Sequence, residues 1–350
     1  MTTKAMPDYI PTEEDVIQGL QPLRTFVLSI NLYHLFDTGL FDDLMTQGPD
    51  SVENIARRHH CDIDKLTAFF KYLRTEGILE QAGELFGLSD KGQALRHDQP
   101  YYTFFVGGYA ETFLQIGEKL RENSGWATRN LEKVGVGSSG MARYDTPPIL
   151  HKLIARIPGD CLRLLDIGCG QGRDLADLCE ALPQIEAAYG VEPDPESCEA
   201  ARALIRSRGL EDKIRVVNSS SSEFLQSDIA DDPHLLILGY VIQEILGQEG
   251  REGVIEFLTR LTDRFPKLYL IVMEVDRQWD SPIMQHGYAL GFYNPYYLIH
   301  AFTNQRLETA AFWEALFADC KLAILAKETI DSTRLIPVYL LRRYSAELSS

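Results

Sequence analysis

The spacing of apolar residues predicts a helical first part of the chain. Between residues 22 and 95, apolar side chains recur at three- and four-residue steps, which is the spacing of amphipathic helices. Ser51 is suited to cap one short helix, and Asp62 or Asp64 is suited to cap the next. Two short strands follow, joined by a turn around Gly83. The pattern therefore predicts three helices and a β-hairpin.

The second part of the chain, from Cys161 onward, alternates between strand and helix patterns. Such alternation with short connections predicts a doubly wound parallel sheet with helices on both faces. The tail adds a helix at 307–318 and strands at 322–328 and 335–342, which we expect to form an antiparallel hairpin at the sheet edge. The other predicted strands are 162–167, 187–191, 214–217, 234–238 and 268–272, and the other helices are 174–181, 195–208 and 250–264.

These patterns divide the chain into three predicted segments. Residues 1–100 form a helical domain with the element order of a winged helix, and residues 156–350 form an α/β domain with a Rossmann-like sheet. Residues 101–155 are interpreted as a helical connector and lid. Within it, the glycine-rich stretch 134–140 predicts a mobile loop, and the Pro-Pro turn at 145–148 predicts the start of the next helix.

A winged helix raises the possibility of DNA binding, which the charge of the chain disfavours. The 350 residues carry 34 Lys and Arg against 51 Asp and Glu, a formal net charge of −17. The expected recognition helix at 64–75 has no basic stripe, and an acidic body repels phosphate backbones and anionic lipid. We therefore expect this domain to dimerise the chain and cover a site, with no nucleic acid or membrane as partner.

The remaining composition indicates an intracellular protein. No apolar stretch is long enough for a transmembrane helix, and the first residues lack the pattern of a secretory signal. Six cysteines are scattered without a Cys-x-x-Cys pair, which is typical of a reduced, cytoplasmic chain. Cys169 and Cys179 are too far apart, and have too few companions, to predict a zinc site.

The segment with the clearest chemical meaning is the glycine-rich turn at 164–173. Gly168, Gly170 and Gly172 come directly after an apolar strand and directly before a helix, where a turn must let a ligand approach the backbone. Asp166 precedes them, and Glu192 ends the next strand, where an acid accepts hydrogen bonds from ribose hydroxyls. No Lys-Ser/Thr pair follows, so a triphosphate loop is excluded, and the GxGxG spacing disfavours a dinucleotide site.

Asp-Ile-Gly-Cys-Gly-x-Gly with a downstream acid resembles the class I S-adenosylmethionine-dependent methyltransferases, over residues 163–343. The resemblance implies that Asp166, Gly168 and Gly170 line the methionine and ribose side of the cofactor, and that Glu192 holds the ribose. At the position of the family's adenine-binding acid this chain has Ser220. A hydroxyl can bind adenine more weakly, and the alternative is that the serine-rich turn caps the helix at 222–225.

The winged helix joined to this fold resembles the small-molecule O-methyltransferases of plants and bacteria. In that group the N-terminal domain dimerises and covers the acceptor pocket, and a histidine commonly acts as base. The corresponding stretch 274–280 contains no histidine.

Residues 289–292 and 328–332 are similar to the bacterial α-keto acid C-methyltransferases, which make β-methylated amino acids for peptide natural products. Those enzymes hold a divalent metal with two histidines and an aspartate. Here the three positions fall on Gln243, about Tyr296 and Glu274, so we expect no metal. His286 and His300 lie out of register, and we interpret them as packed residues.

Aromatic residues are abundant near the expected acceptor site, and tyrosine faces attract cations such as a sulfonium or a guanidinium. Most of these rings are expected in the core. Tyr144, before the Pro-Pro helix entry, is the strongest candidate to face the cofactor cleft, and we place Tyr240 on the cofactor side.

Two functions from the same fold remain open. The first is methyl transfer to a small molecule of specialised metabolism, an α-keto acid or amino-acid derivative, with Glu244 or Glu274 as base and Gln243 bonding the acceptor. The second, by resemblance to methyltransferase-like azetidine-2-carboxylate synthases, is cyclisation of S-adenosylmethionine itself to azetidine-2-carboxylate and methylthioadenosine. A third hypothesis is a non-catalytic regulator that binds the cofactor, and the intact glycine motif disfavours it.

Overall fold

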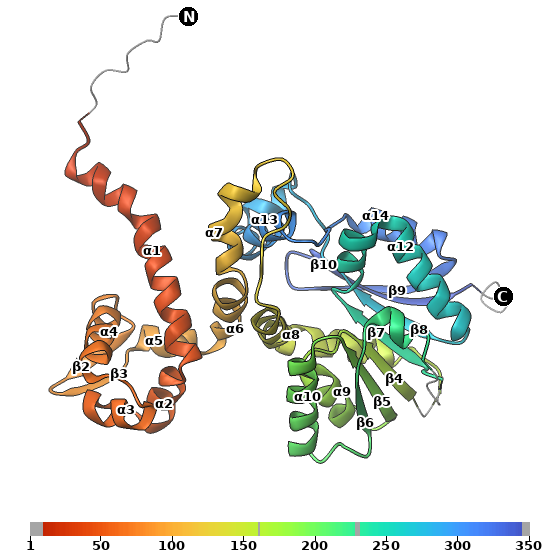
Figure 1. Ribbon diagram of the computed structural model, residues 1–350, viewed down its shortest axis with the longest axis horizontal. Helices are drawn as coiled ribbons and strands as arrows, with labels where there is room; N and C mark the ends of the chain where they lie inside the picture. Colours follow the sequence, from red (N-terminus) through yellow and green to blue (C-terminus); the bar gives the residue numbers. More distant parts are fainter. Residues whose placement is uncertain (1–9, 160–161, 228–231, 345–350) are drawn as a thin grey trace, which may run out of the picture. The chain divides into compact units, whose positions relative to one another are not determined.

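The computed structural model describes residues 10–159, 162–227 and 232–344, except for the side chains of Tyr144 and Ser222. The chain divides into two compact units, residues 1–107 and 108–350. The first unit runs from red to orange in Figure 1, and the second from yellow to blue.

The first unit has the winged-helix order that the sequence predicts. Ser51 caps α3 by accepting from the Asn54 N–H at 3.3 Å, and Asp62 caps α4 by accepting from the Lys65 N–H at 3.0 Å. The strands form an antiparallel sheet of order β1-β3-β2. The elements are α1 (Glu13–Asp37), α2 (Leu40–Gln47), β1 (Asp50–Ser51), α3 (Val52–His59), α4 (Ile63–Thr75), β2 (Leu79–Ala82), β3 (Leu85–Leu88), α5 (Asp90–Ala94) and α6 (Gln99–Tyr102).

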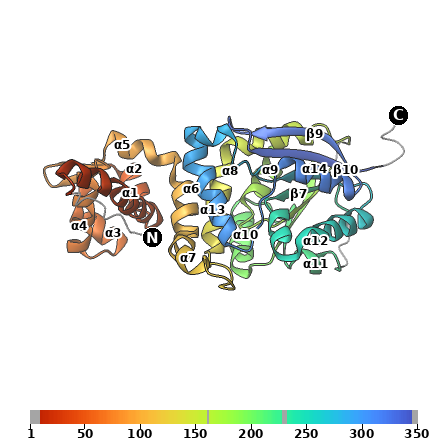
Figure 2. The same ribbon diagram turned by 90° about the horizontal axis from the view of Figure 1, so that it is seen from above.

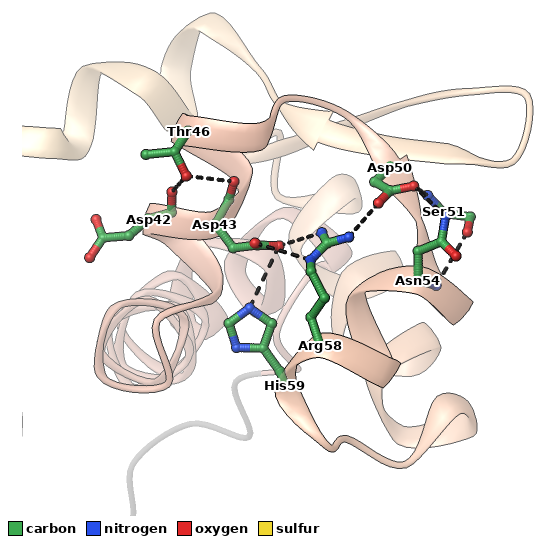
Figure 3. A network of polar contacts seen from close by, with 8 residues as sticks. All are labelled: Asp42, Asp43, Thr46, Asp50, Ser51, Asn54, Arg58 and His59. Carbon is green, nitrogen blue, oxygen red and sulfur yellow. Dashed lines mark hydrogen bonds and ion pairs between the residues drawn. The ribbon is translucent and has the colours of Figure 1, made fainter.

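An arginine joins three of these elements on the surface of the unit. Arg58, near the end of α3, pairs with Asp43 on α2 and with Asp50 on β1, each at 2.6 Å (Figure 3). The interaction of one guanidinium with two carboxylates in a fixed geometry is stronger than that of a single exposed ion pair. The network therefore fixes α3 against its neighbours.

The second unit carries the predicted α/β sheet. Seven strands lie in the order β6-β5-β4-β7-β8-β10-β9, and all pairings are parallel except those of β10 with β8 and β9. The predicted antiparallel hairpin at the edge is thus confirmed. The elements are α7 (Ala110–Lys119), α8 (Leu131–Ile154), β4 (Leu162–Ile167), α9 (Arg173–Ala181), β5 (Ile185–Glu192), α10 (Pro195–Ser207), β6 (Ile214–Asn218), α11 (Ser221–Phe224), β7 (Leu235–Gly239), α12 (Ile242–Arg264), β8 (Tyr269–Met273), α13 (Asn294–Phe302), α14 (Ala310–Asp319), β9 (Leu322–Ile330) and β10 (Ile336–Arg343).

Helices cover both faces of this sheet. One face packs against α11, α12 and α14, with Phe224, Leu258 and Trp313 in a core shared with alternate strand residues. Helices α8, α9 and α10 lie together on the other side (Figures 1 and 2). Away from the sheet, α7 lies beside α13, and the Ala127 N–H donates to the Phe302 carbonyl at 2.8 Å.

Two predictions of local structure are wrong. The stretch 134–140, expected as a mobile loop, lies inside α8, and Pro147 and Pro148 lie within that helix rather than at its start. Asn130 caps α8 by accepting from the Lys133 N–H at 3.0 Å, and the helix packs against α9 and β9. This packing outweighs the low helix propensity of glycine and proline.

Candidate active site

The glycine turn joins β4 to α9 at the carboxyl edge of the sheet. Gly168, Gly170 and Gly172 have φ angles of 83°, 52° and 71°, which other residues rarely adopt. A Cβ atom on Gly168 would lie 3.0 Å from the Val241 side chain. The positive φ angles disfavour side chains at all three positions, and a Cβ atom on Gly170 would meet no atom within 4 Å, so there is room for a ligand beside the backbone there.

Glu192, at the end of β5, holds this turn in place. Its Oε2 accepts from the Gly170 N–H at 3.0 Å, and its Oε1 accepts from the Asp194 N–H at 3.0 Å. Burial raises the pKa of Glu192. Each carboxylate oxygen has two acceptor sites, so both oxygens can still receive ribose hydroxyls.

Asp166 lies beside Glu192 in a strongly acidic environment. Burial, together with the charges of Asp174 and Glu192, raises the pKa of Asp166 to about 7. Asp174, in the first turn of α9, accepts from the Ser139 hydroxyl at 3.0 Å. Three carboxyl groups around one turn favour a cationic ligand.

Ser220 acts as the N-cap of α11. Its hydroxyl accepts from the Glu223 N–H at 3.2 Å, and the Glu223 carboxylate accepts from the Ser220 N–H at 3.1 Å. This is the capping alternative considered above. An adenine contact of Ser220 stays a prediction.

Tyr240 links the cofactor turn to the acceptor side. It follows β7 in the left-handed region at φ 60°, which is strained for a tyrosine, and its N–H donates to the Met273 carbonyl at 2.9 Å. Burial raises the pKa of Tyr240, and the charges of Glu274, Asp331 and Asp174 act in the same direction. The Tyr240 hydroxyl is therefore close enough to be affected by the charges of Asp174, at the cofactor turn, and of Glu274, at the acceptor side.

Glu274 is a fully buried acid directly after β8. Its exposure is 0%, and its Oε1 accepts from the N–H groups of Ile242 and Gln243, at 3.0 and 3.3 Å, where α12 begins. Burial raises its pKa well above the ordinary value. No hydrogen-bond partner of its Oε2 is found among the described residues.

Gln243 connects Glu274 to two aromatic rings on α13. Its Nε2 lies 3.4 Å from the Tyr296 hydroxyl and 3.4 Å from His300 Nε2. His300 Nδ1 lies 2.7 Å from the Tyr296 carbonyl, and burial lowers the pKa of His300 to about 3. The imidazole is therefore neutral, with its Nδ1–H donating and its Nε2 accepting.

Glu244 has a different environment from Glu274. Its Oε1 accepts from both terminal nitrogens of Arg129, at 3.2 Å each, and from Gln305 Nε2 at 3.0 Å. Glu244 is held by these contacts with Arg129 and Gln305, so its role in this geometry is to orient Arg129. Tyr109 completes this group, with its hydroxyl 3.4 Å from Gln305 Oε1.

Sequence reasoning missed Arg129 and Gln305. Arg129 and Glu244 are 115 residues apart, and no local pattern marks either as a partner of the other. The polar residues Gln243, Glu244 and Glu274, by contrast, are brought together as their strand-end positions suggested. The side chain of Tyr144, another predicted site residue, lies outside the described part of the chain, although its backbone belongs to α8.

The residues at the three inherited metal positions do not fit a transition metal. They provide an amide, a phenol and a buried carboxyl, and both nitrogens of the neighbouring His300 are used in contacts. Within the described ranges, no group of three or more His, Cys, Asp or Glu could hold a metal ion. No step through a metal is therefore derived.

Comparison with known proteins agrees with this site. Residues 164–261 match the family model described as a methyltransferase domain. Mitomycin 7-O-methyltransferase superposes with a TM-score of 0.66 at 16% identity, over 95% of this chain and 98% of that one. The SAH-bound methyltransferase CalO1 of calicheamicin biosynthesis gives a TM-score of 0.57 at 16% identity, over 96% and 100%. The fold and site define a class I methyltransferase that uses S-adenosylmethionine.

A more specific relationship comes from sequence. The chain is 36% identical over 340 residues to 2-ketoarginine methyltransferase of Streptomyces arginensis, covering 94% of this chain and 96% of that protein. The chain belongs to the family of that enzyme, and it is an S-adenosylmethionine-dependent methyltransferase. Among the helices that the structure describes, none is long and apolar enough to cross a membrane.

Proposed function

We propose that this enzyme methylates a small α-keto acid, with the carbon next to the keto group as the methyl acceptor. The main support is the near full-length similarity to a methyltransferase named for a 2-keto acid. The buried polar group around Gln243 and Glu274, next to Tyr240 and the cofactor turn, also supports it. Such a group can hydrogen-bond the oxygen at carbon 2 of the acceptor.

Arg129 is the proposed receptor for the acceptor's carboxylate. Its side chain is 14% exposed, and it pairs with Glu244 through its two terminal nitrogens. A guanidinium carries five N–H donors, so donors remain for a second carboxylate. Arg129 would thereby orient the acceptor toward the sulfonium methyl group, which an SN2 transfer requires.

The test is incubation of the purified protein with S-adenosylmethionine and a panel of α-keto acids, beginning with 2-ketoarginine. Mass spectrometry is expected to detect one keto acid carrying an added methyl group, together with S-adenosylhomocysteine. Carbon-13 NMR with a labelled methyl donor locates the methylated atom. Consumption of the donor with no methylated acid, or methylation at oxygen or nitrogen, overturns the proposal.

Cyclisation of S-adenosylmethionine stays the second candidate, favoured by the poor metal site and by the acidic turn. In this reaction the unprotonated methionyl amine attacks the γ-carbon, and the carbon–sulfur bond breaks with its electron pair going to sulfur. Asp166, with a pKa of about 7, is suited to take the ammonium proton first. The same incubation without an acceptor distinguishes the two reactions, because only cyclisation releases methylthioadenosine and azetidine-2-carboxylate.

The first unit is the proposed dimerisation domain, and residues 101–155 the proposed lid. Helix α1 exposes a series of large apolar side chains, a feature typical of a contact surface in a folded protein. The exposed fractions range from 43% to 61% for Val16, Ile17, Leu20, Leu23, Phe26 and Val27.

A further inference from the structure

Two buried polar atoms at the acceptor side have no partner among the described residues. They are Gln243 Oε1 and Glu274 Oε2, on side chains that are 2% and 0% exposed. Buried polar atoms are paired in the great majority of cases, because leaving one unpaired forfeits its bonds to water. Glu274 Oε1 accepts from the backbone N–H of Gln243 at 3.3 Å, so the two residues are neighbours, and two such atoms in one buried group point to a polar ligand.

The chemical character of the Gln243 atom is set by its neighbours. His300 Nδ1 donates to the Tyr296 carbonyl at 2.7 Å, so His300 Nε2 must accept, and the nitrogen of the Gln243 amide faces it at 3.4 Å. The oxygen of that amide is consequently the unpaired atom. It can only accept a hydrogen bond.

The Glu274 atom has the opposite character. Its other oxygen already accepts two backbone N–H groups, and no cation is among its hydrogen-bond or ion-pair partners in the described chain. A carboxyl group without exposure and without a counter-ion is neutral, because burial penalises the charged form. Its free oxygen therefore carries a proton and can donate.

One donor beside one acceptor matches a hydroxyl group, which accepts and donates at once. A keto oxygen can only accept, so it would leave Gln243 Oε1 unpaired. The enol of an α-keto acid carries such a hydroxyl, next to the carbon that receives the methyl group. Both side chains lie at the carboxyl ends of β7 and β8, the edge where α/β sheets bind ligands.

We propose that Gln243 and Glu274 bind the enol hydroxyl of the acceptor, and thereby take the place of the metal used by related C-methyltransferases. This inference rests on the proposed α-keto acid function. The protein's share is selection of the enol tautomer by hydrogen bonding, without a metal ion and without an ionised base at Glu274. On methyl transfer the carbon–sulfur bond of the donor breaks, the sulfonium leaves as S-adenosylhomocysteine, and the enol becomes the methylated keto acid with release of its hydroxyl proton to solvent.

Calorimetry on the full chain saturated with S-adenosylhomocysteine tests the pair without turnover. The probes are 2-ketoarginine and its 2-hydroxy analogue, which differ in whether the oxygen at carbon 2 can donate. The wild-type protein is expected to bind the hydroxy acid about tenfold more tightly. Gln243→Met, which keeps the size and removes the acceptor, is expected to abolish that preference.

Two variants distinguish whether Glu274 acts as a hydrogen-bond donor or as a base or metal ligand. They are Glu274→Gln and Glu274→Met. The Gln variant keeps an N–H donor and is expected to keep the preference and most methyl transfer, whereas the Met variant loses both. Circular dichroism and S-adenosylhomocysteine affinity report whether each variant is folded. Loss of activity in Glu274→Gln with an intact fold, or a stoichiometric metal whose chelation stops turnover, overturns the inference and leaves the proposed function standing.

The binding experiment also tests the Gln243–Glu274 pair if the proposed function is wrong. If no α-keto acid is methylated, the binding preference is measured over the same panel of 2-oxo and 2-hydroxy acids. A hydroxyl preference lost in Gln243→Met supports the pair even then. Equal affinities, or no binding of either class, overturns it.

Discussion

Asp166 is one of two carboxyl groups at the cofactor turn whose charge changes near neutral pH. Burial and two neighbouring acids raise the pKa of Asp166 to about 7, well above the usual value near 4, and burial raises the pKa of Asp174 to about 6. A bound sulfonium and ammonium favour the ionised form, so binding of S-adenosylmethionine releases a proton below that pKa. The dissociation constant is expected to rise as pH falls below about 7, by at most about tenfold per pH unit.

Calorimetry between about pH 5.5 and 8 measures this dependence, with Asp166→Asn as the matched variant. The Asn variant is expected to bind more weakly and with a shallower pH dependence, in which the remaining change comes from Asp174, whose pKa burial raises to about 6. The free energy of unfolding changes with pH in the opposite direction. A raised carboxyl pKa makes the free protein less stable as pH rises from about 4 to 7. An unchanged slope in Asp166→Asn would contradict the assignment.

Arg129 is a second residue whose charge is expected to affect function. Arg129→Gln is expected to raise the KM for the α-keto acid by about tenfold to a hundredfold, because a charge-assisted contact is lost. The affinity for S-adenosylmethionine is expected to change little. Arg260→Gln, at an exposed pair with Glu256 on α12, is the control. Steady-state kinetics decide, and equal effects of the two variants would remove Arg129 from the site.

The glycine turn between β4 and α9 can be tested by adding a side chain at Gly168. Gly168→Val places a branched side chain at φ 83° and against Val241, so it is expected to abolish cofactor binding. Gly209→Ala is the control, since Gly209 also has a positive φ of 65° and no atom within 4 Å of its Cβ position. Calorimetry with S-adenosylmethionine is expected to show loss of binding in the first variant only. Loss in both would indicate a general effect of strain.

Most elements of the sheet could be predicted because their signals are local. The run at 162–167 coincides with β4, and the acid at the end of β5 meets the glycine turn because adjacent parallel strands share an edge. The first part of α8, before the predicted start at 145–148, was missed, since glycine and proline lower the local signal and only packing restores the helix. The Arg129–Glu244 pair was missed because it depends on the fold of distant segments.

At the scale of the whole molecule, the surface of α1 predicts the state of association. Leu20→Glu with Leu23→Glu is expected to convert a dimer to a monomer, because charges are excluded from an apolar interface. Leu114→Glu on α7, at a side chain that is 78% exposed, is the control. Light scattering coupled to size-exclusion chromatography gives the mass. A monomeric wild-type protein, or a dimer that survives the double variant, would contradict the prediction.

Helix α12 is divided at Gly250, where φ is 76° and ψ is −173°. Both halves contribute to the core: Ile242 and Leu246 lie before the break, and Val254, Leu258 and Leu261 lie after it. The first half also carries Gln243 and Glu244, so one short helical segment supplies both core packing and polar groups of the site. A change of acceptor in this family is therefore expected to substitute single positions of this segment, because replacing Ile242 or Leu246 would also lower the stability of the enzyme.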